Sequence, residues 1–186
     1  TEKSIRIYRN CIAGKVYNEK WVLERAARDY PMRLDGEKLK KKSGFLSSSL
    51  KKIRVCEDAA ELRGLEGEAA SVYFSVFDDL ILQQKEDFFF HGRSKRPPTD
   101  KVNAMLSFAY TLLTGMCAGA LETVGLDPYA GFFHTDRPGR MSLALDMVEE
   151  LRSVLADRFV LTIINKKIVK PEGFDQKENG AVIMDD

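Results

Sequence analysis

Apolar residues recur at positions i, i+3, i+4 and i+7 along most of the chain, which is the spacing of one buried face of an α-helix. Polar residues, glycine and proline interrupt the pattern at a few places. The helix over 100–121 is apolar on nearly all sides, so we expect it to be the central buried helix of an all-α, multi-helix domain. The full set of predicted helices covers 4–30, 43–53, 58–81, 100–121 and a last one from 142 to between 160 and 165.

The segments between these helices are rich in charged or turn-forming residues. A lysine run over 38–42 follows Asp35 and Gly36 and predicts an exposed loop. Near the C-terminus, 181–184 has the composition of a β-strand, which we interpret as the remnant of a small β-hairpin whose partner strand is missing. We therefore expect the chain to be a fragment that holds one helical domain.

The composition describes a globular protein, with 44% hydrophobic residues, 31% charged residues and a formal net charge of +1. The net charge alone does not indicate a nucleic-acid partner, although the basic residues are clustered. No apolar run is expected to reach the length of a membrane span and no secretory signal opens the chain, which predicts a cytoplasmic protein without a membrane partner. Three scattered cysteines, Cys11, Cys56 and Cys117, predict reduced thiols.

Glu66 is a carboxylate on the otherwise apolar face of the helix predicted over 58–81. Gly64 and Gly67 flank it, and each costs a helix interior roughly 0.5–1 kcal/mol relative to alanine. An ionised acid on a buried face needs a positive partner. Two interpretations stay open: the helix is rotated so that Glu66 lies at a solvated edge, or Glu66 belongs to a functional site.

The last predicted helix carries a stripe of acids opposite its apolar stripe. Asp146 and Glu149 are three residues apart, so their carboxylates lie side by side. The apolar stripe, which includes Met147 and Leu155, is expected to be buried, and a polar stripe of this kind is typical of a solvated face. His134 lies in a turn-rich segment ahead of this helix, where a single histidine has a structural role more often than a ligand role.

Taken together, Glu66, His134, Asp146 and Glu149 supply three carboxylates and one imidazole. This donor set suits Mg²⁺ or Mn²⁺ better than zinc, because it contains no thiolate and oxygen ligands dominate. A divalent cation would also be the positive partner that Glu66 requires. A carboxylate di-iron bundle is disfavoured, because neither histidine follows a glutamate by three residues.

These residues lie within longer strings that carry a family resemblance. The strings are RGLEGEAASVYF over 63–74, RPPTDKVNAML over 96–106, and GFFH over 131–134 followed by SLALDMVEELR over 142–152. In this order and at these separations they resemble the helical domain of Cas1, the family of CRISPR-associated spacer-acquisition integrases. The resemblance extends from about residue 4 to residue 167.

The resemblance implies that 1–186 is the all-helical catalytic domain and that a smaller β-rich dimerisation domain and the extreme C-terminus are missing. It implies that Glu66, His134 and Glu149 are the metal ligands. Asp146 would be a carboxylate that acts in catalysis or supports those ligands.

The activity implied by the resemblance is that of an endonuclease and integrase dependent on Mg²⁺ or Mn²⁺. It inserts spacer DNA into a CRISPR array by attack of a DNA 3′-hydroxyl on a phosphodiester. Its partners would be double-stranded DNA from the protospacer and the repeat, a second copy in a homodimer, and a Cas2 subunit. Two alternatives stay open, a non-catalytic helical scaffold that binds nucleic acid and a plain repair nuclease. The arginines expected to contact DNA phosphates are Arg93, Arg96, Arg137, Arg140 and Arg152.

Overall fold

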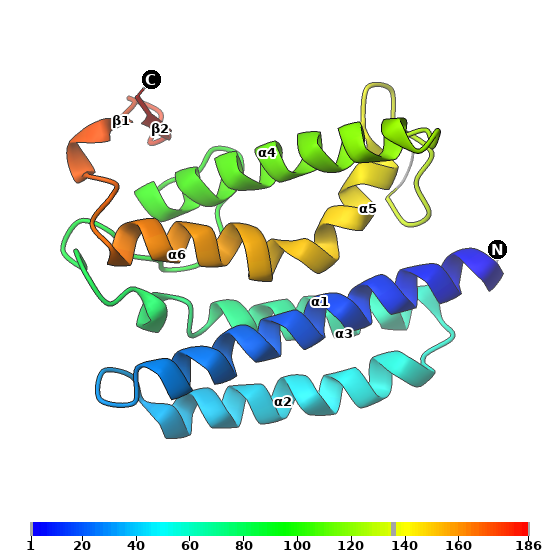
Figure 1. Cartoon of the computed structure of the whole chain (residues 1–186), viewed down its shortest axis with the longest axis horizontal. Coiled ribbons are helices and arrows are strands. Elements are labelled where there is room, and N and C mark those ends of the chain that lie inside the picture. Colours follow the sequence, from blue (N-terminus) through cyan, green and yellow to red (C-terminus); the bar gives the residue numbers. More distant parts are fainter. Residues whose placement is uncertain (1, 135–136, 186) are drawn as a thin grey trace.

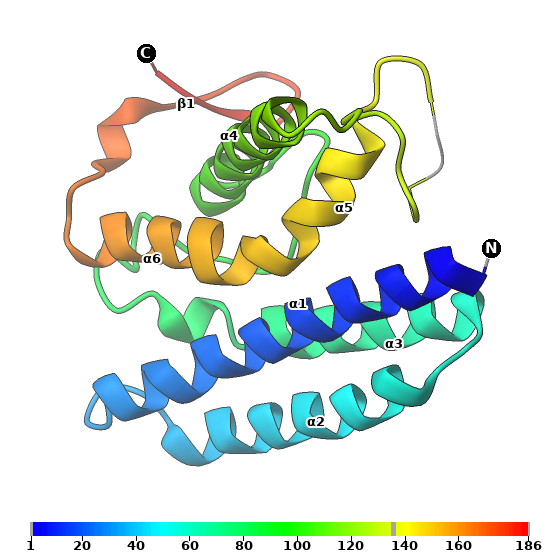
Figure 2. The same ribbon diagram turned by 45° about the vertical axis from the view of Figure 1, so that its right-hand side comes forward.

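The structure, a computed structural model, describes residues 2–134 and 137–185. Its first part is a layer of helices that lie side by side in both views, in the lower half of Figure 1 and Figure 2. Apolar side chains from all of these helices fill the main core. The helices of this layer are α1 (Glu2–Asp29), α2 (Gly36–Val55) and α3 (Ala59–Phe74).

The second part of the chain forms the upper half of the molecule. One helical run, in which the π-helical segment η2 joins α5 to α6, lies between α4 and α1 (Figure 1). π-Helical turns within α-helices are rare, and those that occur often lie at functional sites. The elements are α4 (Lys101–Thr123), α5 (Ser142–Leu151), η2 (Arg152–Asp157) and α6 (Arg158–Asn165).

Short elements complete the fold. Strands β1 (Phe174–Gln176) and β2 (Val182–Met184) pair antiparallel, with Phe174 opposite Met184. The predicted all-α class with a small β-hairpin near the C-terminus is therefore confirmed. The prediction that the strand over 181–184 lacks its partner is wrong, because β1 supplies it. The 3₁₀ turns are η1 (Asp78–Leu80) and η3 (Pro171–Gly173).

The lysine run lies in a helix and not in the predicted loop. α2 begins at Gly36, because the Asp35 side chain accepts a hydrogen bond from the Lys38 backbone N–H at 2.9 Å and caps the helix. Leu39 and Leu46 turn toward the core, whereas the lysines lie on the more exposed side. Solvated lysines are good helix formers, so the charge run did not signal a break.

α3 ends earlier than its apolar pattern predicts. Asp58 caps its start as expected, by accepting the Glu61 backbone N–H at 2.7 Å, but the helix stops at Phe74 and not near Ile81. Phe77 and Ile81 remain fully buried in the turns that follow. The apolar spacing persists beyond the helix because the turns continue to face the core.

α4 is buried on one face and not on all sides. Asp100 caps it, and it packs on α5 and α6, while Phe108, Leu112 and Met116 are exposed on its other face. Contrary to the expectation from sequence, α4 is long and apolar enough to cross a membrane by length and composition. Core helices of soluble proteins pass the same test, so this property alone assigns no membrane role.

Candidate functional site

A lysine of α1 brings two of the predicted site residues together. Lys15 Nζ lies 2.6 Å from Glu66 Oε1 on α3 and 2.8 Å from Glu149 Oε2 on α5. Tyr8, two turns earlier on α1, donates its hydroxyl to Glu66 Oε2 at 2.9 Å. α1 runs between α3 and α5 (Figure 2), so one helix supplies the contacts that join both carboxylates.

Glu66 is therefore not an acid at a solvated edge. Its side chain is 19% exposed and has the positive partner that burial demands, although that partner is a lysine. Burial works against protonation of Lys15, but the carboxylates of Glu149, Glu66 and Glu19 outweigh it and raise the lysine pKa above its ordinary value. The ammonium group is thus firmly charged between the two acids.

Two acids of the last helical run, Asp146 and Glu149, are buried, whereas the sequence pattern predicted a solvated stripe. Asp146 and Glu149 are buried, whereas Met147 and Leu155 are 39% and 51% exposed. The acids are buried because each meets a donor: Lys15 for Glu149, and backbone N–H groups for Asp146. Val148, an apolar residue between them, is also fully buried, so acids and apolar side chains both build the interior at this point.

Glu149 is held between two cations. Besides Lys15, Arg152 Nη1 lies 2.5 Å from Glu149 Oε1, one turn along the same run. Burial alone would raise the Glu149 pKa, but Lys15 and Arg152 outweigh it, so the pKa lies below its ordinary value. Glu149 is therefore ionised and both of its oxygens are occupied by donors.

Asp146 organises the turn that carries His134. It accepts the backbone N–H groups of Phe132, Phe133 and His134 at 2.6, 3.0 and 3.1 Å, and its Oδ1 lies 2.6 Å from His134 Nδ1. Burial opposes ionisation of Asp146, but these hydrogen bonds hold its pKa below the ordinary value. With Nδ1 bound to a carboxylate, His134 has the arrangement that directs Nε2 toward a ligand.

The His134 turn also packs against α1. The Phe133 ring stacks on the Tyr8 ring, with centroids 3.5 Å apart. A side chain at Gly131 would collide with Ser142, because an added Cβ would lie 2.5 Å from Ser142 Cβ. Only glycine permits this close approach of the turn to the start of α5. Residues 135 and 136 of the predicted turn lie outside the described residues.

The predicted site residues are thus brought together as two pairs. Glu66 and Glu149 share Lys15, His134 and Asp146 share a hydrogen bond, and the contact between Tyr8 and Phe133 connects the pairs. In the described part of the chain, no three acids, histidines or cysteines are grouped closely enough to hold a metal ion. The donor types suit a divalent cation, but an ammonium group lies between the carboxylates.

Sequence reasoning assigned no role to a third buried acid on the same run, Asp157. Asp157 accepts the hydroxyl groups of Tyr73 at 3.0 Å and Tyr110 at 2.6 Å. Tyr73 is fully buried, and Tyr110 is partly buried against the main core. Burial raises the Asp157 pKa to about 6, although hydrogen bonds from Tyr110 and Tyr73 offset part of the effect.

Two of the five predicted DNA-contacting arginines are engaged inside the protein. Arg93 donates to Asn103 Oδ1 at 2.6 Å, and its guanidinium lies 5.1 Å from the centroid of the Tyr110 ring. Arg152 contacts the same ring at 5.0 Å in addition to Glu149. Arg96 and Arg137 are exposed. The exposed arginines, Arg96 and Arg137, are therefore more accessible to an external anion than Arg93 and Arg152.

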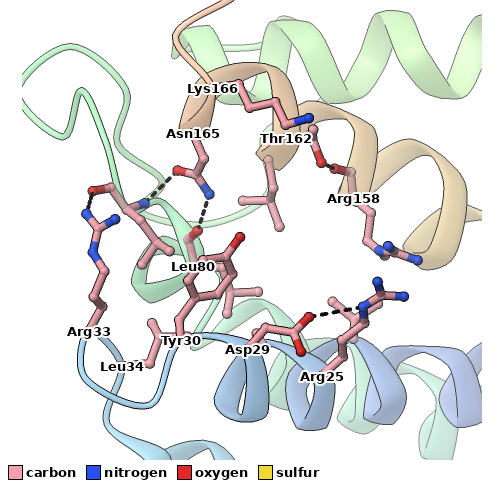
Figure 3. Close-up of a pocket in the computed structure, with 14 residues that line it drawn as sticks. Arg25, Asp29, Tyr30, Arg33, Leu34, Leu80, Arg158, Thr162, Asn165 and Lys166 are labelled. Carbon is pink, nitrogen blue, oxygen red and sulfur yellow. Dashed lines mark hydrogen bonds and ion pairs between the residues drawn. The ribbon is translucent and has the colours of Figure 1, made fainter.

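A cavity of about 350 Å³ lies elsewhere, between the C-terminal end of α1 and α6. Figure 3 shows Arg25 paired with Asp29 and Asn165 bonded to the backbone beside it. Asn165 Nδ2 donates to the Leu80 carbonyl at 2.9 Å. None of the residues that line this cavity belongs to the two pairs of the candidate site.

We expect Glu19, on α1 near Lys15, to make stability fall as pH rises. Burial raises its pKa to about 8, against an ordinary value near 4.3. Between these values the folded state holds a proton that the unfolded chain has released, so the free energy of unfolding decreases as pH increases, by about 1.4 kcal/mol per pH unit at most. The loss is complete above pH 8.

Urea unfolding at pH 5, 6.5 and 8 checks this expectation. Glu19→Gln keeps the neutral form at every pH, so its stability should change less across the window and exceed that of the wild type at pH 8. Asp157 titrates in both proteins, so the difference between them isolates Glu19. Parallel pH profiles would contradict the raised pKa.

The fold and site together describe a helical domain with an interior of paired carboxylates and an oriented histidine. The family model of the CRISPR associated protein Cas1 matches residues 1–186. The chain belongs to the Cas1 family. This confirms the resemblance that the three sequence strings indicate.

Similar proteins support the same family. The chain is 49% identical over 185 residues to the CRISPR-associated endonuclease Cas1 1 of Chlorobaculum tepidum. The alignment covers 100% of this chain and 54% of that relative. A casposase bound to integration product is 26% identical with a TM-score of 0.81, over 100% of this chain and 50% of that one. A chain of a partial Cas6-RT-Cas1–Cas2 complex shares the fold with a TM-score of 0.83 and is 22% identical. The match covers 100% of this chain and 54% of that one. The chain thus spans about half the length of such relatives.

Proposed function

We propose that this domain carries the metal site of a DNA endonuclease and integrase that inserts spacer DNA into a CRISPR array. One observation carries the proposal: carboxylates from α3 and α5 converge on a single buried cation, Lys15 Nζ, beside a histidine oriented by Asp146. The turn that carries this histidine packs on the same helix as the two acids, through the stacked rings of Phe133 and Tyr8. The relatives named as endonucleases support the same chemistry.

The residues that would hold the proposed Mg²⁺ or Mn²⁺ ion are Glu66, Glu149 and His134, the last of them through Nε2. The ion would neutralise charge on the phosphate under attack by the 3′-hydroxyl. Asp146 has both oxygens occupied by backbone N–H groups and the His134 ring, which favours a positioning role over proton transfer. Arg152 contacts Glu149 and the Tyr110 ring, so it supports the Glu149 carboxylate.

DNA binding is proposed for the arginines around this site. Phosphate contacts by arginine give affinity without reading sequence, and they make binding fall steeply with salt. Arg96, Arg137 and Arg140 are the more accessible candidates, while Arg93 and Arg152 would need to exchange internal contacts for phosphate. Double-stranded DNA, a second copy of the protein and a Cas2 subunit remain the proposed partners, in the cytoplasm.

A thermal shift with Mn²⁺ tests the metal site. An ion that binds only the folded state at 100 times its dissociation constant adds about 2.7 kcal/mol, which raises the Tm of a domain of this size by roughly 5–10 °C. Glu66→Ala should remove the shift. Glu68→Ala, which changes an exposed glutamate of the same helix, should retain it. An unchanged Tm in Mn²⁺ would favour the non-catalytic scaffold.

A further inference from the structure

All four oxygens of the two proposed ligand carboxylates are already occupied. Tyr8 and Lys15 hold the oxygens of Glu66, and Lys15 and Arg152 hold those of Glu149. A divalent ion that binds both acids therefore competes with these donors for the carboxylate oxygens. Lys15 is the donor that the two carboxylates share, so its departure frees one oxygen on each.

Electrostatics leads to the same conclusion. An ammonium group and a divalent cation repel each other strongly when they share ligand oxygens at contact distance inside a protein. Moving Lys15 to bulk water is opposed by its surroundings, since the side chain is buried between α1, α3 and α5. The ammonium group needs a second acceptor inside the protein.

Glu19 lies one helical turn beyond Lys15 on α1, at the i+4 position where a lysine and a glutamate side chain meet. It is 2% exposed, and its Oε2 has no hydrogen-bond partner among the residues that the structure describes. A buried, unpartnered carboxyl oxygen costs free energy that a new donor would recover. Burial raises the Glu19 pKa to about 8, although the nearby Lys15 ammonium group opposes the rise.

We propose that Lys15 is an internal counter-cation that holds the ligand carboxylates in the metal-free protein and moves to Glu19 when the divalent ion binds. This inference rests on the proposed function, because it assumes that Glu66 and Glu149 are ligands. On this basis the site is preassembled without metal, and the exchange lowers the affinity for the ion. Glu19 is a positioning residue that makes the exchange less costly.

The test measures the Mn²⁺ dissociation constant by titration calorimetry, and the Tm of the metal-free protein, for Lys15→Gln, Glu19→Gln and the double variant. Lys15→Gln keeps hydrogen-bonding capacity and removes the charge. We expect it to lower the metal-free Tm and to tighten Mn²⁺ binding about tenfold or more. Lys20→Gln is the matched control, because it removes a charge from α1 at a lysine that pairs with Glu24.

The double variant separates the exchange from a general electrostatic effect. Glu19→Gln should weaken Mn²⁺ binding about tenfold when Lys15 is present and have no effect in the Lys15→Gln background, because no ammonium group then needs a second acceptor. Equal weakening by Glu19→Gln in both backgrounds would overturn the proposal. If Lys15→Gln fails to fold, a Lys15→Arg variant, which keeps the charge, takes its place in the test. It should bind Mn²⁺ no more tightly than the wild type, and tighter binding would count against the exchange.

Failure of this inference and failure of the proposed function give different results. Glu66-dependent Mn²⁺ binding in the wild type, with an unchanged dissociation constant in Lys15→Gln, overturns only the exchange. Absence of Glu66-dependent binding in the wild type overturns the metal site and the exchange with it. A lower metal-free Tm in Lys15→Gln would in that case show that Lys15 acts only as a fixed counter-ion.

Discussion

Alanine at Glu66, His134 or Glu149 is expected to abolish Mn²⁺-dependent cleavage and joining of DNA while the helices persist. Each change removes one proposed ligand of the ion. Loss of a residue that only supports a ligand typically lowers metal affinity or activity about 10–100-fold, so loss of a ligand itself should have a larger effect. The Glu66 and Glu149 variants also leave Lys15 with one carboxylate partner where it now has two. Stability should therefore fall in these two variants, independently of metal.

The measurement is the rate of joining of a DNA 3′ end to a repeat-containing duplex in Mn²⁺, with circular dichroism to verify the helices. Glu68→Ala is the matched control, since Glu68 is an exposed glutamate two residues after Glu66 on α3. It should keep wild-type rates. Wild-type activity in any one of the three ligand variants would refute the assignment of that residue.

Helical periodicity predicted where most of the helices lie in the sequence, because long amphipathic helices repeat apolar residues at a regular spacing. α1 and the run from α5 to α6 lie where the apolar spacing places them. The errors arise where the spacing or charge of the side chains does not match the secondary structure of the backbone. Turns after Phe74 bury apolar side chains without being helical, and the lysines of α2 form a helix although their charge resembles that of a loop.

The site was predicted less completely, because its central contact joins residues far apart in sequence. Glu66, His134 and Glu149 are visible as unusual residues in their own elements, and sequence strings indicated their family. Lys15 is one lysine among many in an imperfect apolar face, adjacent to Val16 and three residues after Ile12. That position on a buried face was the available signal, but its two partners are set only by tertiary packing.

The burial of Asp146 and Glu149 could not be derived from periodicity. Periodicity shows that a helix has one acidic face and one apolar face. It does not show whether the acids are also buried. The hydrogen-bond donors decide which residues are buried. Lys15 donates to Glu149 and backbone N–H groups donate to Asp146, and these contacts offset the desolvation cost of burying the two carboxylates. Leu155 is then left on the exposed side.

Asp146→Ala is expected to lower both stability and metal affinity. It removes the acceptor of three backbone N–H groups and of the His134 ring, and each buried donor left unpaired costs about 1–3 kcal/mol. A total of about 3 kcal/mol would lower the Tm by roughly 6–12 °C. The His134 ring would also lose its fixed orientation, so Mn²⁺ affinity should fall about 10–100-fold.

Thermal unfolding without metal and calorimetric Mn²⁺ titration measure the two effects separately. Asp127→Ala is a matched control, because Asp127 accepts one backbone N–H, that of Tyr129, in an exposed turn. Asp146→Asn keeps one carbonyl oxygen and should give an intermediate result. If Asp146→Ala lowers the Tm no more than Asp127→Ala, the turn is held by its packing against Tyr8 and not by the carboxylate. A preserved Mn²⁺ affinity in a destabilised Asp146→Ala protein would mean that His134 does not depend on Asp146 for its orientation.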